Sequence, residues 1–493
     1  MLEEKFRCHP SIIVEKLGGI ITAIFFIVIA SIDDIKDMIL EDIVSYYYLI
    51  ILGVIGLLTI ILIYNIVVWS KTFISIEGNT IIVQRNTISS KVKTYGIQNI
   101  SNVNLEQNIF EQIVGTFKIK IDTDSLSTAD NTDIEIILSK KDAYEFKNKV
   151  IQLMNNEKLK HVDEDKINLQ DDIMKEDLFN EENIEYDIVY SVNDVLKHCF
   201  YNFSVFGFIF NLAVIAVTLL MVLQVDSLGG IVAIGLIIIT SGISILKFFV
   251  GDLFKYYNFS IKRLEDKLYI SYGLFKKRKF TVPVNRINAI NIKQSALSRI
   301  FKRYNADIVT IGVGNDESEG SQILLSAKKE AFSRNMKILL PELALGENIN
   351  LQRQPKKHFI IKLIEMLIVT IISTIILYCI YNLDYKIPGI IFFVIWLCII
   401  LMGVIIIQMN YITKGFYIGE ENLVISWGVF SKKISVIKYK KVQYIDIKEN
   451  PISSKLNLCK GEIYILASLG NSTRALGYYE LALFEKLGHK IIN

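Results

Sequence analysis

The chain repeats one layout three times: a pair of long apolar segments is followed by a polar stretch that opens with alternating, strand-like residues. In the second and third copies, residues 268–275 align with residues 423–430, and a constant shift of 155 positions continues the match. The first copy aligns with the second at a shift of 187, which places Ile100 under Ile287. Internal repeats define an architecture before any single residue is interpreted. The sequence therefore predicts three related modules.

The apolar segments indicate a membrane protein. Of the 493 residues, 52% are hydrophobic, and the mean hydropathy of +0.38 is too high for an ordinary soluble enzyme. A helix needs about 20 apolar residues to cross the hydrocarbon core. The six predicted spans comprise residues 17–32, 46–69, 203–223, 229–246, 359–381 and 388–409. For each span the alternative is a buried core helix, and the first and fifth spans are the weakest candidates.

The distribution of basic residues predicts the orientation. The loop inside the first pair, residues 33–42, is acidic, whereas Lys71, Lys247 and Lys414 follow the outer ends of the three pairs. Loops rich in lysine and arginine stay on the cytoplasmic side. We expect a multi-pass protein of the plasma membrane, with both termini and all three modules in the cytoplasm.

Each module has the pattern of a small β structure closed by a helix. In the second copy, residues 267–272, 279–284 and 287–293 read as strands, and residues 328–340 place apolar side chains at helical spacing. An amphipathic helix can cover the open face of a small curved sheet. The predicted fold is an α+β membrane protein with six transmembrane helices in three hairpins, each followed by a cytoplasmic β-barrel or half-barrel with a C-terminal helix.

Domain boundaries follow from the same repeat. The segment 155–190 contains 12 acidic and 4 basic residues and little periodicity, so we interpret it as a solvated linker. It is either a plain spacer or a tether that competes with acidic lipid for neighbouring basic faces. The predicted hairpins are residues 1–70, 191–252 and 346–412, and the predicted modules are residues 71–154, 253–345 and 413–493.

At this level the chain resembles the bacterial pleckstrin-homology-like membrane proteins of the YdbT type, whose helix hairpins alternate with PH-like domains. In that family a basic residue and a His-Pro precede each hairpin. Here Arg7-Cys-His-Pro matches fully, while Lys197-His198 and Lys357-His358 lack the proline. The resemblance covers nearly the whole length. It implies a seven-stranded PH-like barrel with a C-terminal helix, and it implies no known chemistry.

His9, His198 and His358 are therefore the repeated histidines of the three copies. One imidazole per module does not make a metal site, because no cysteine or carboxylate is repeated beside it at ligand spacing. We expect no metal and no cofactor. An imidazole near the headgroups can bind phosphate or cap a helix, so we predict an interfacial role at the helix start.

No enzyme signature is present. The chain lacks phosphate-binding glycine loops, HExxH and GxSxG, and Gly312-Val-Gly314 is interpreted as a turn between strands. Asn65, Asn211 and Gln408 are uncharged residues within predicted spans, and we expect them to bridge helices. Transport lacks the paired ionisable residues that usually mark its pathway. We predict that the protein is not an enzyme.

Two basic clusters are the remaining candidates for binding. The first is Lys276, Lys277, Arg278 and Lys279, which we place in a hairpin turn after Gly273, and the second contains Lys432 and Lys433. One interpretation is a basic surface without a specific ligand, since lysines beside an anionic leaflet gain about 1 kcal/mol each without specificity. The other is a site for anionic lipid headgroups or an acidic protein.

The function that we predict is a non-enzymatic scaffold held at the cytoplasmic face of the membrane. Its three PH-like domains would bind protein partners or anionic lipid, in envelope homeostasis or membrane-stress tolerance. We expect the partners to be membrane lipids and either a smaller PH-like membrane protein or a second copy, and no nucleic acid. The alternative is a transporter or channel component regulated by its cytoplasmic domains.

Overall fold

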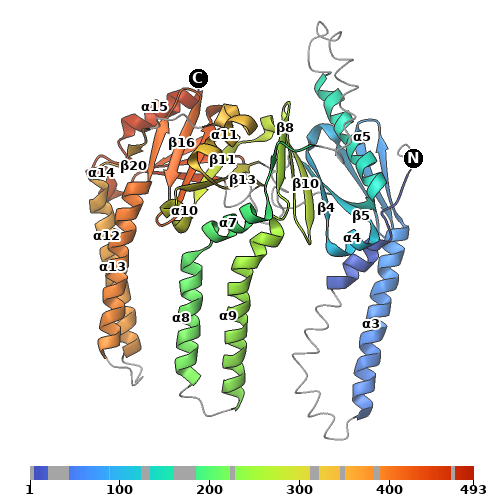
Figure 1. The fold of residues 1–493 in the computed structure, drawn as a ribbon, viewed down its shortest axis with the longest axis horizontal. Coiled ribbons are helices and arrows are strands. Elements are labelled where there is room, and N and C mark those ends of the chain that lie inside the picture. Colours follow the sequence, from blue (N-terminus) through green and yellow to red (C-terminus); the bar gives the residue numbers. More distant parts are fainter. Residues whose placement is uncertain are drawn as a thin grey trace. The chain divides into compact units, whose positions relative to one another are not determined.

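The structure is a computed structural model of the whole chain (Figure 1). It describes residues 5–19, 44–87, 89–123, 134–159, 185–222, 228–310, 321–344, 350–381, 389–467 and 472–492. The first predicted span, most of the acidic linker and Gly312-Val-Gly314 lie largely or wholly outside these ranges. The chain forms two compact units, which are residues 1–185 with 275–281, and residues 186–274 with 282–493. Each unit is described by itself.

The first unit contains the first module. Its first three strands form the antiparallel sheet β1-β2-β3, and the next three form the order β6-β5-β4. A helix over residues 11–19 precedes the strands, as does the long helix α3. The elements are α3 (Val44–Ser70), β1 (Thr72–Glu77), β2 (Thr80–Asn86), β3 (Ser90–Gly96), η1 (Ile97–Asn99), β4 (Ile100–Gln107), α4 (Ile109–Val114), β5 (Thr116–Thr123), β6 (Ile134–Ser139) and α5 (Lys140–Leu159).

The second unit begins with the second module and its helices. The elements are β7 (Ile188–Val189), α7 (Val192–Asn202), α8 (Val205–Val222), α9 (Leu228–Lys255), β8 (Ser260–Leu264), β9 (Lys267–Tyr272), β10 (Lys277–Pro283), η5 (Val284–Arg286), β11 (Ala289–Gln294), α10 (Ala296–Ile300), β12 (Arg303–Val309), β13 (Ser321–Lys328), α11 (Lys329–Leu339) and η6 (Pro341–Leu343). By its contacts, most of β10 belongs to the first unit. The strand β9 spans the predicted residues, and α11 lies within the predicted helix.

The third module completes the second unit. Its elements are β14 (Gln352–Arg353), α12 (His358–Tyr381), α13 (Gly389–Thr413), β15 (Gly415–Ile418), β16 (Asn422–Trp427), β17 (Lys432–Lys438), η7 (Tyr439–Lys441), β18 (Val442–Lys448), α14 (Pro451–Lys455), β19 (Cys459–Ile465), β20 (Thr473–Tyr479) and α15 (Leu481–Ile492). Three modules thus share one order: three strands, a 3-10 turn, a strand, a short helix, two strands and a closing helix. The three predicted related modules are confirmed.

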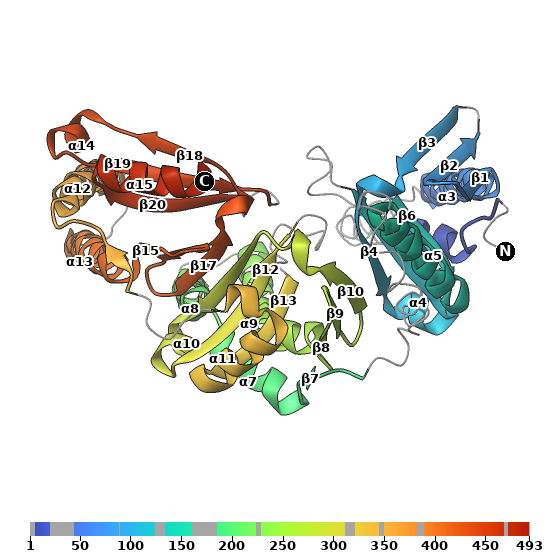
Figure 2. The same cartoon turned by 90° about the horizontal axis from the view of Figure 1, so that it is seen from above.

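Each closing helix buries a stripe of apolar side chains. In α15, Phe484 and Leu487 are buried three positions apart and join a core with Phe416 and Leu476. Figure 2 shows α15 lying across the sheet of β18, β19 and β20. In α5, Phe146 is fully buried in the core of the first module. Burial of such a side chain contributes roughly 1.5–3 kcal/mol, so the helix is part of each core.

Sheets continue from one module to the next. In the second unit, β11 pairs antiparallel with β17, which makes one seven-stranded sheet in the order β13-β12-β11-β17-β16-β15-β14. In the first unit, β4 pairs with residues 277–279 of β10. We call these pairings the second joint and the first joint. The barrel closed within each module, which the family resemblance implied, is not formed among the described residues. Instead, in the second unit the last three strands of the second module and the first three strands of the third module lie in one sheet.

A short segment before each hairpin returns to the sheet of the module that follows. The two-residue strand β7 pairs with β8, and β14 pairs with β15. In the first module, Phe6 forms the equivalent bridge with Ile74. The basic-His motif follows this segment in each copy, directly at Arg7, four residues after β14 at Lys357, and within α7 at Lys197.

Long apolar helices are present among the described residues. Three are long and apolar enough to cross a membrane: Leu52–Ser70 in α3, His358–Cys379 in α12 and Trp396–Thr413 in α13. A fourth candidate combines Val192–Asn202 with Gly207–Ile215, which are bent by 67° relative to each other. The helices α12 and α13 contact each other, as do α8 and α9, and the members of each pair run side by side in Figure 1. Six spans in three hairpins stay a prediction.

Two of the polar residues in the apolar helices form hydrogen bonds within their own helix. The side-chain amide of Asn65 donates to Ile61 O at 2.9 Å, and that of Asn211 donates to Gly207 O at 2.9 Å. Each amide thus has a partner on its own helix, four residues earlier, and a bridge to a neighbouring helix stays a prediction. Short-range bonds of this kind compete with inter-helix bonds for the same donor.

Candidate functional site

A polar cavity of about 140 Å³ lies where α12 and α13 meet the third module. Helices, the β14 segment and the strands β19 and β20 all contribute side chains to it. Its lining consists of Gln354, His358, Lys362, Glu365, Ile407, Asn410, Lys414, Lys460, Gly477 and Tyr478. We call it the lysine cavity, because three lysines and a single carboxylate line it.

Two of the three lysines already have acidic partners. Lys362 Nζ lies 2.5 Å from Glu365 Oε2, and Lys460 Nζ lies 2.7 Å from Glu462 Oε1. Among the described residues, no carboxylate forms an ion pair with Lys414. Burial, together with the charges of Lys362 and Lys460, lowers the pKa of Lys414 to about 8. A partly buried ammonium group without an ion-pair partner is stabilised by an anion that enters.

The backbone around the cavity is held in an unusual conformation. Gly477 has φ +108°, and a Cβ atom there would lie 2.6 Å from Gln354 Oε1. The same Gln354 oxygen accepts a hydrogen bond from the backbone N–H of Tyr478 at 3.0 Å. A glycine is therefore required at position 477. The close approach aligns β20 with the segment that precedes α12 and shapes one wall of the cavity.

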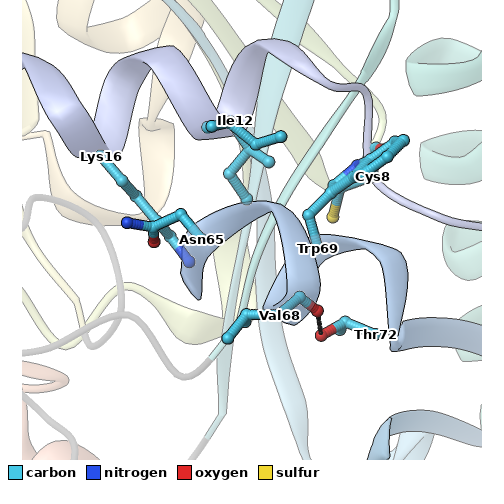
Figure 3. A pocket seen from close by; sticks show the side chains of 8 residues that line it. Cys8, Ile12, Lys16, Asn65, Val68, Trp69 and Thr72 are labelled. Atoms are coloured by element: carbon cyan, nitrogen blue, oxygen red, sulfur yellow. Dashed lines mark hydrogen bonds between the residues drawn. The ribbon is translucent and has the colours of Figure 1, made fainter. Parts of the chain in front are cut away.

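The equivalent place in the first module is smaller and mostly apolar. There a pocket of about 50 Å³ lies between the helix of residues 11–19 and the end of α3, and Lys16 is its single charged lining residue. Figure 3 shows Lys16 beside Asn65 at one end of this pocket and Cys8 at the other. Trp69 Nε1 donates to Cys8 O at 2.7 Å and closes that end. The lysine-rich lining of the third module is therefore not repeated in the first.

The first predicted basic cluster is placed differently from our expectation. Lys277, Arg278 and Lys279 lie on strand β10 rather than in a turn, and only Lys276 precedes the strand. The carboxylate of Glu106 lies 3.3 Å from Lys276 Nζ and 3.6 Å from Arg278 Nε. A turn was expected because Gly273 precedes the cluster, but three further residues separate that glycine from β10. Part of the cluster is thus used in the first joint.

Lys279 and Lys277 have different surroundings. Lys279 Nζ donates to the hydroxyl of Tyr144 on α5 at 2.9 Å, so it also binds within the first unit. Lys277 is exposed. Of the four side chains, Lys276 and Lys277 are the most accessible to a ligand, and a lipid or partner role for the cluster stays a prediction.

The second basic pair lies in the second joint. Lys433 on β17 stands opposite Lys293 on β11, and Lys293 forms an ion pair with Asp307. Lys432 stands opposite Gln294 in the same pairing. Burial lowers the pKa of both Lys432 and Lys433, and Arg299 lowers that of Lys432 further. Binding of a ligand by this pair also stays a prediction.

Two of the three repeated histidines are buried in protein. His198 Nδ1 accepts a hydrogen bond from Ser326 N at 3.1 Å, and its ring packs edge-on against Tyr256. His358, the first residue of α12, stacks on Tyr411 and is 1% exposed. His9 lies 3.0 Å from the hydroxyl of Ser11. His9 and His358 thus lie at the start of a helix, whereas His198 lies within α7 and joins it to β13. A role at the membrane surface stays a prediction.

The described residues contain no group of three histidine, cysteine or acidic side chains arranged to hold a metal ion. The lysine cavity combines cations with amide, imidazole and phenol groups, and its carboxylate Glu365 is paired with Lys362. This arrangement is suited to holding an anion. The sequence pattern does not point to this site, because Lys362, Lys414 and Lys460 are far apart along the chain.

The repeat and the fold agree with the family comparison. A model of the bacterial PH domain matches the chain three times, over residues 22–154, 205–334 and 367–487. The chain belongs to the bacterial PH domain family. Each matched range ends within the closing helix of a module, so one bacterial PH domain comprises the strands and that helix together with part of the preceding apolar segments.

A transmembrane protein of known sequence is similar over nearly the whole chain. Over 503 aligned residues the chain is 22% identical to the UPF0699 transmembrane protein YdbT of Bacillus subtilis (strain 168). The alignment covers 95% of this chain and 93% of that protein. No solved structure matches the chain. Together with the apolar helices, this relative identifies a membrane protein that carries three bacterial PH domains.

Proposed function

We propose that the protein is a non-enzymatic scaffold anchored in the plasma membrane by three helix hairpins, with both termini and all three PH domains in the cytoplasm. The basic residues at the outer ends of the apolar pairs support this orientation. In this arrangement the lysine cavity lies at the cytoplasmic surface of the bilayer, since it is built on the ends of α12 and α13 that adjoin the third module.

The third PH domain binds the phosphate of an anionic lipid headgroup in the lysine cavity. The observation that carries this proposal is the lysine cavity around Lys414, a partly buried ammonium group with a pKa lowered to about 8 and no ion-pair partner among the described residues. Basic pockets between membrane helices on the cytoplasmic side are suited to anionic headgroups. Lys460 and Lys362 approach the same space from β19 and α12 and increase the positive potential.

The test uses the intact protein in lipid nanodiscs that contain phosphatidylglycerol in phosphatidylcholine. We expect the wild type to retain phosphatidylglycerol through detergent exchange, and the double variant Lys414→Gln and Lys460→Gln to retain several-fold less. The control is Lys71→Gln, because Lys71 directly follows α3 as Lys414 directly follows α13, but its side chain is exposed. Equal retention by the double variant and the wild type would contradict the proposal.

A conducting pathway receives no support from the polar residues of the apolar helices. The amides of Asn65 and Asn211 bond to their own helices and therefore offer no pair of facing polar groups. We propose no enzymatic function, because Glu365, the one carboxylate that lines the lysine cavity, is already paired with Lys362. A scaffold at the membrane surface fits a role in envelope homeostasis or membrane-stress tolerance, which we propose as its physiological setting.

A further inference from the structure

The two joints between modules are copies of one another. In the first joint Arg278 stands opposite Glu106, and in the second joint Lys433 stands opposite Lys293. A shift of 187 positions carries Glu106 to Lys293, and a shift of 155 carries Arg278 to Lys433. These are the two shifts that relate the modules in the sequence. The same pair of strands therefore meets in the same antiparallel register each time.

The chain has one strand of each kind left over. The strand β3 is equivalent to β10 and β17, and β18 is equivalent to β4 and β11. Each lies at the edge of its three-stranded sheet. Within the described ranges, no strand pairs with the outer edge of either one.

These edges carry exposed apolar side chains, and one of them has a buried counterpart in the second joint. Ile447 on β18 is 40% exposed, whereas its equivalent in the second joint, Ile292, is 2% exposed. Val92 on β3 is 59% exposed. A flat edge strand with exposed apolar residues is a template for pairing with another chain. The two free edges therefore match the two halves of a joint.

We propose that β18 of one copy pairs with β3 of a second copy, so that the joint used within the chain also links copies head to tail. This proposal rests on the scaffold function proposed above. It names the partner of the scaffold, which is a second copy of this chain. Strand addition of this kind supplies main-chain hydrogen bonds along the whole edge. Because the contact is heterologous, it builds rings or open chains.

The register of the two known joints predicts which residues meet. Carried over by the same shifts, it places Val92 opposite Ile447 and Lys93 opposite Asp446. The first pair is apolar and the second carries opposite charges. At the place of this second pair, the second joint contains Asn291 and Ser435, whose side chains are hydrogen-bonded at 2.9 Å. Both an apolar and a polar contact of the known joint thus have counterparts in the proposed one.

The proposed register also places two like charges opposite each other, Lys91 and Lys448. The second joint contains such a pair as well, because Lys433 stands opposite Lys293. There Asp307 pairs with Lys293. On β18, Asp446 already lies 2.5 Å from Lys448 Nζ. The second carboxylate oxygen of Asp446 remains able to accept Lys93.

Disulfide crosslinking between two differently tagged copies tests the proposal. In a background without the five native cysteines, one copy carries Val92→Cys and the other carries Ile447→Cys. Opposite residues in antiparallel strands have Cα atoms about 4.5–5.5 Å apart, which suits a disulfide. We expect a linked dimer that contains both tags. The control replaces Val92→Cys by Thr94→Cys, which is exposed and two residues out of register, and we expect several-fold less linkage.

Three results would overturn the proposal: no mixed-tag dimer, equal linkage in the out-of-register control, or linkage only within a single chain that carries both cysteines. A charge exchange adds a second readout. Lys93→Glu on the first copy should reduce linkage several-fold, and Asp446→Lys on the second copy should restore it. Linkage should be unchanged in Lys414→Gln with Lys460→Gln, so failure of the lipid site and failure of this joint are distinguishable.

Discussion

Arg278 on β10 stands opposite Glu106 on β4, with its Nε atom 3.6 Å from the carboxylate. Lys120 on β5 approaches the same carboxylate at 3.1 Å, so Glu106 lies between two cations in the sheet. Next to the second joint these charges are exchanged: Lys293 on β11 takes the place of Glu106, and Asp307 on β12 takes the place of Lys120 and pairs with Lys293. Lys293 stands opposite Lys433. The two joints therefore share a register but differ in their charge pattern. A strand that paired at the wrong joint would therefore meet an unfavourable charge pattern, and this disfavours incorrect pairing.

Replacement of Glu106 tests the charge pattern of the first joint. Glu106→Gln leaves Lys120, Lys276 and Arg278 close together without their shared carboxylate. Removing one partner of a buried ion pair costs about 3–5 kcal/mol, and the exposure of Lys276 places the expected loss near the lower value. We expect a lower thermal unfolding midpoint for the first unit, measured on the intact protein in nanodiscs.

Glu135→Gln is the matched control for this change. Glu135 also approaches Lys120, at 3.9 Å, but its side chain is 48% exposed. Exposed pairs contribute at most about 1 kcal/mol, so the midpoint should hardly move. A loss as large as that of Glu106→Gln would show that the effect does not come from the buried joint.

The stability of the first joint should depend on pH through Glu106. Although burial raises the pKa of Glu106, the charges of Lys120, Lys276 and Arg278 outweigh it and hold the pKa below its ordinary value of 4.5. The unfolded chain therefore binds the proton more readily, and the ionised carboxylate stabilises the folded state above pH 4.5. We expect the midpoint difference between wild type and Glu106→Gln to be constant near neutral pH. It should close as the pH falls through the lowered pKa, and a difference that grows on acidification would contradict this account.

Binding of an anion in the lysine cavity should weaken in alkali. Because the pKa of Lys414 is lowered to about 8, the empty cavity loses its central positive charge as the pH rises through that value. Affinity for a short-chain phosphatidylglycerol should then fall by up to about tenfold per pH unit above about 8 and stay level below it. Calorimetric titration of the wild type and Lys414→Arg checks this, because arginine stays charged and should remove the decline. A decline of equal size in both proteins would assign the titration to another group.

Gly477 offers a test of how the cavity wall is built. In Gly477→Ala the new methyl group would meet Gln354 in a backbone conformation, φ +108°, that alanine rarely adopts. The strain costs of order 1–3 kcal/mol and should lower both the unfolding midpoint and the retention of phosphatidylglycerol. Gly488→Ala on α15 is the control, because nothing lies within 4 Å of its added Cβ. Both variants should express equally, and an unaffected Gly477→Ala would remove Gln354 from the account.

Local patterns in the sequence predicted much of the fold. The alternation of residues 267–272 predicts β9, and apolar spacing predicts the closing helices, because both periods are carried by neighbouring residues. The strands β7 and β14 were not predicted, since two residues are too short to show a period. The joints were not predicted for another reason. The strands β11 and β17 lie far apart along the chain, and a local sequence pattern does not indicate which strands pair with each other.

The candidate site was harder to predict. Lys414 and Lys362 stand out only as polar residues at the ends of apolar segments, and Lys460 lies on a strand with no distinguishing neighbour. Folding brings the three together from α12, the end of α13 and β19. Conversely, Arg278 in its run of basic residues looked like an exposed charge, yet it is 7% exposed and opposite Glu106. Clusters in sequence and clusters in space coincide only when a single element carries them.

Placement of all three PH domains on the cytoplasmic side is the central claim, and cysteine labelling in intact cells tests it most directly. In a background without native cysteines, the exposed residues Lys141, Lys337 and Lys486 on the three closing helices are changed to cysteine one at a time. A membrane-impermeant maleimide should label none of them in intact cells and all three after permeabilisation. Labelling of any one of the three in intact cells would contradict the account.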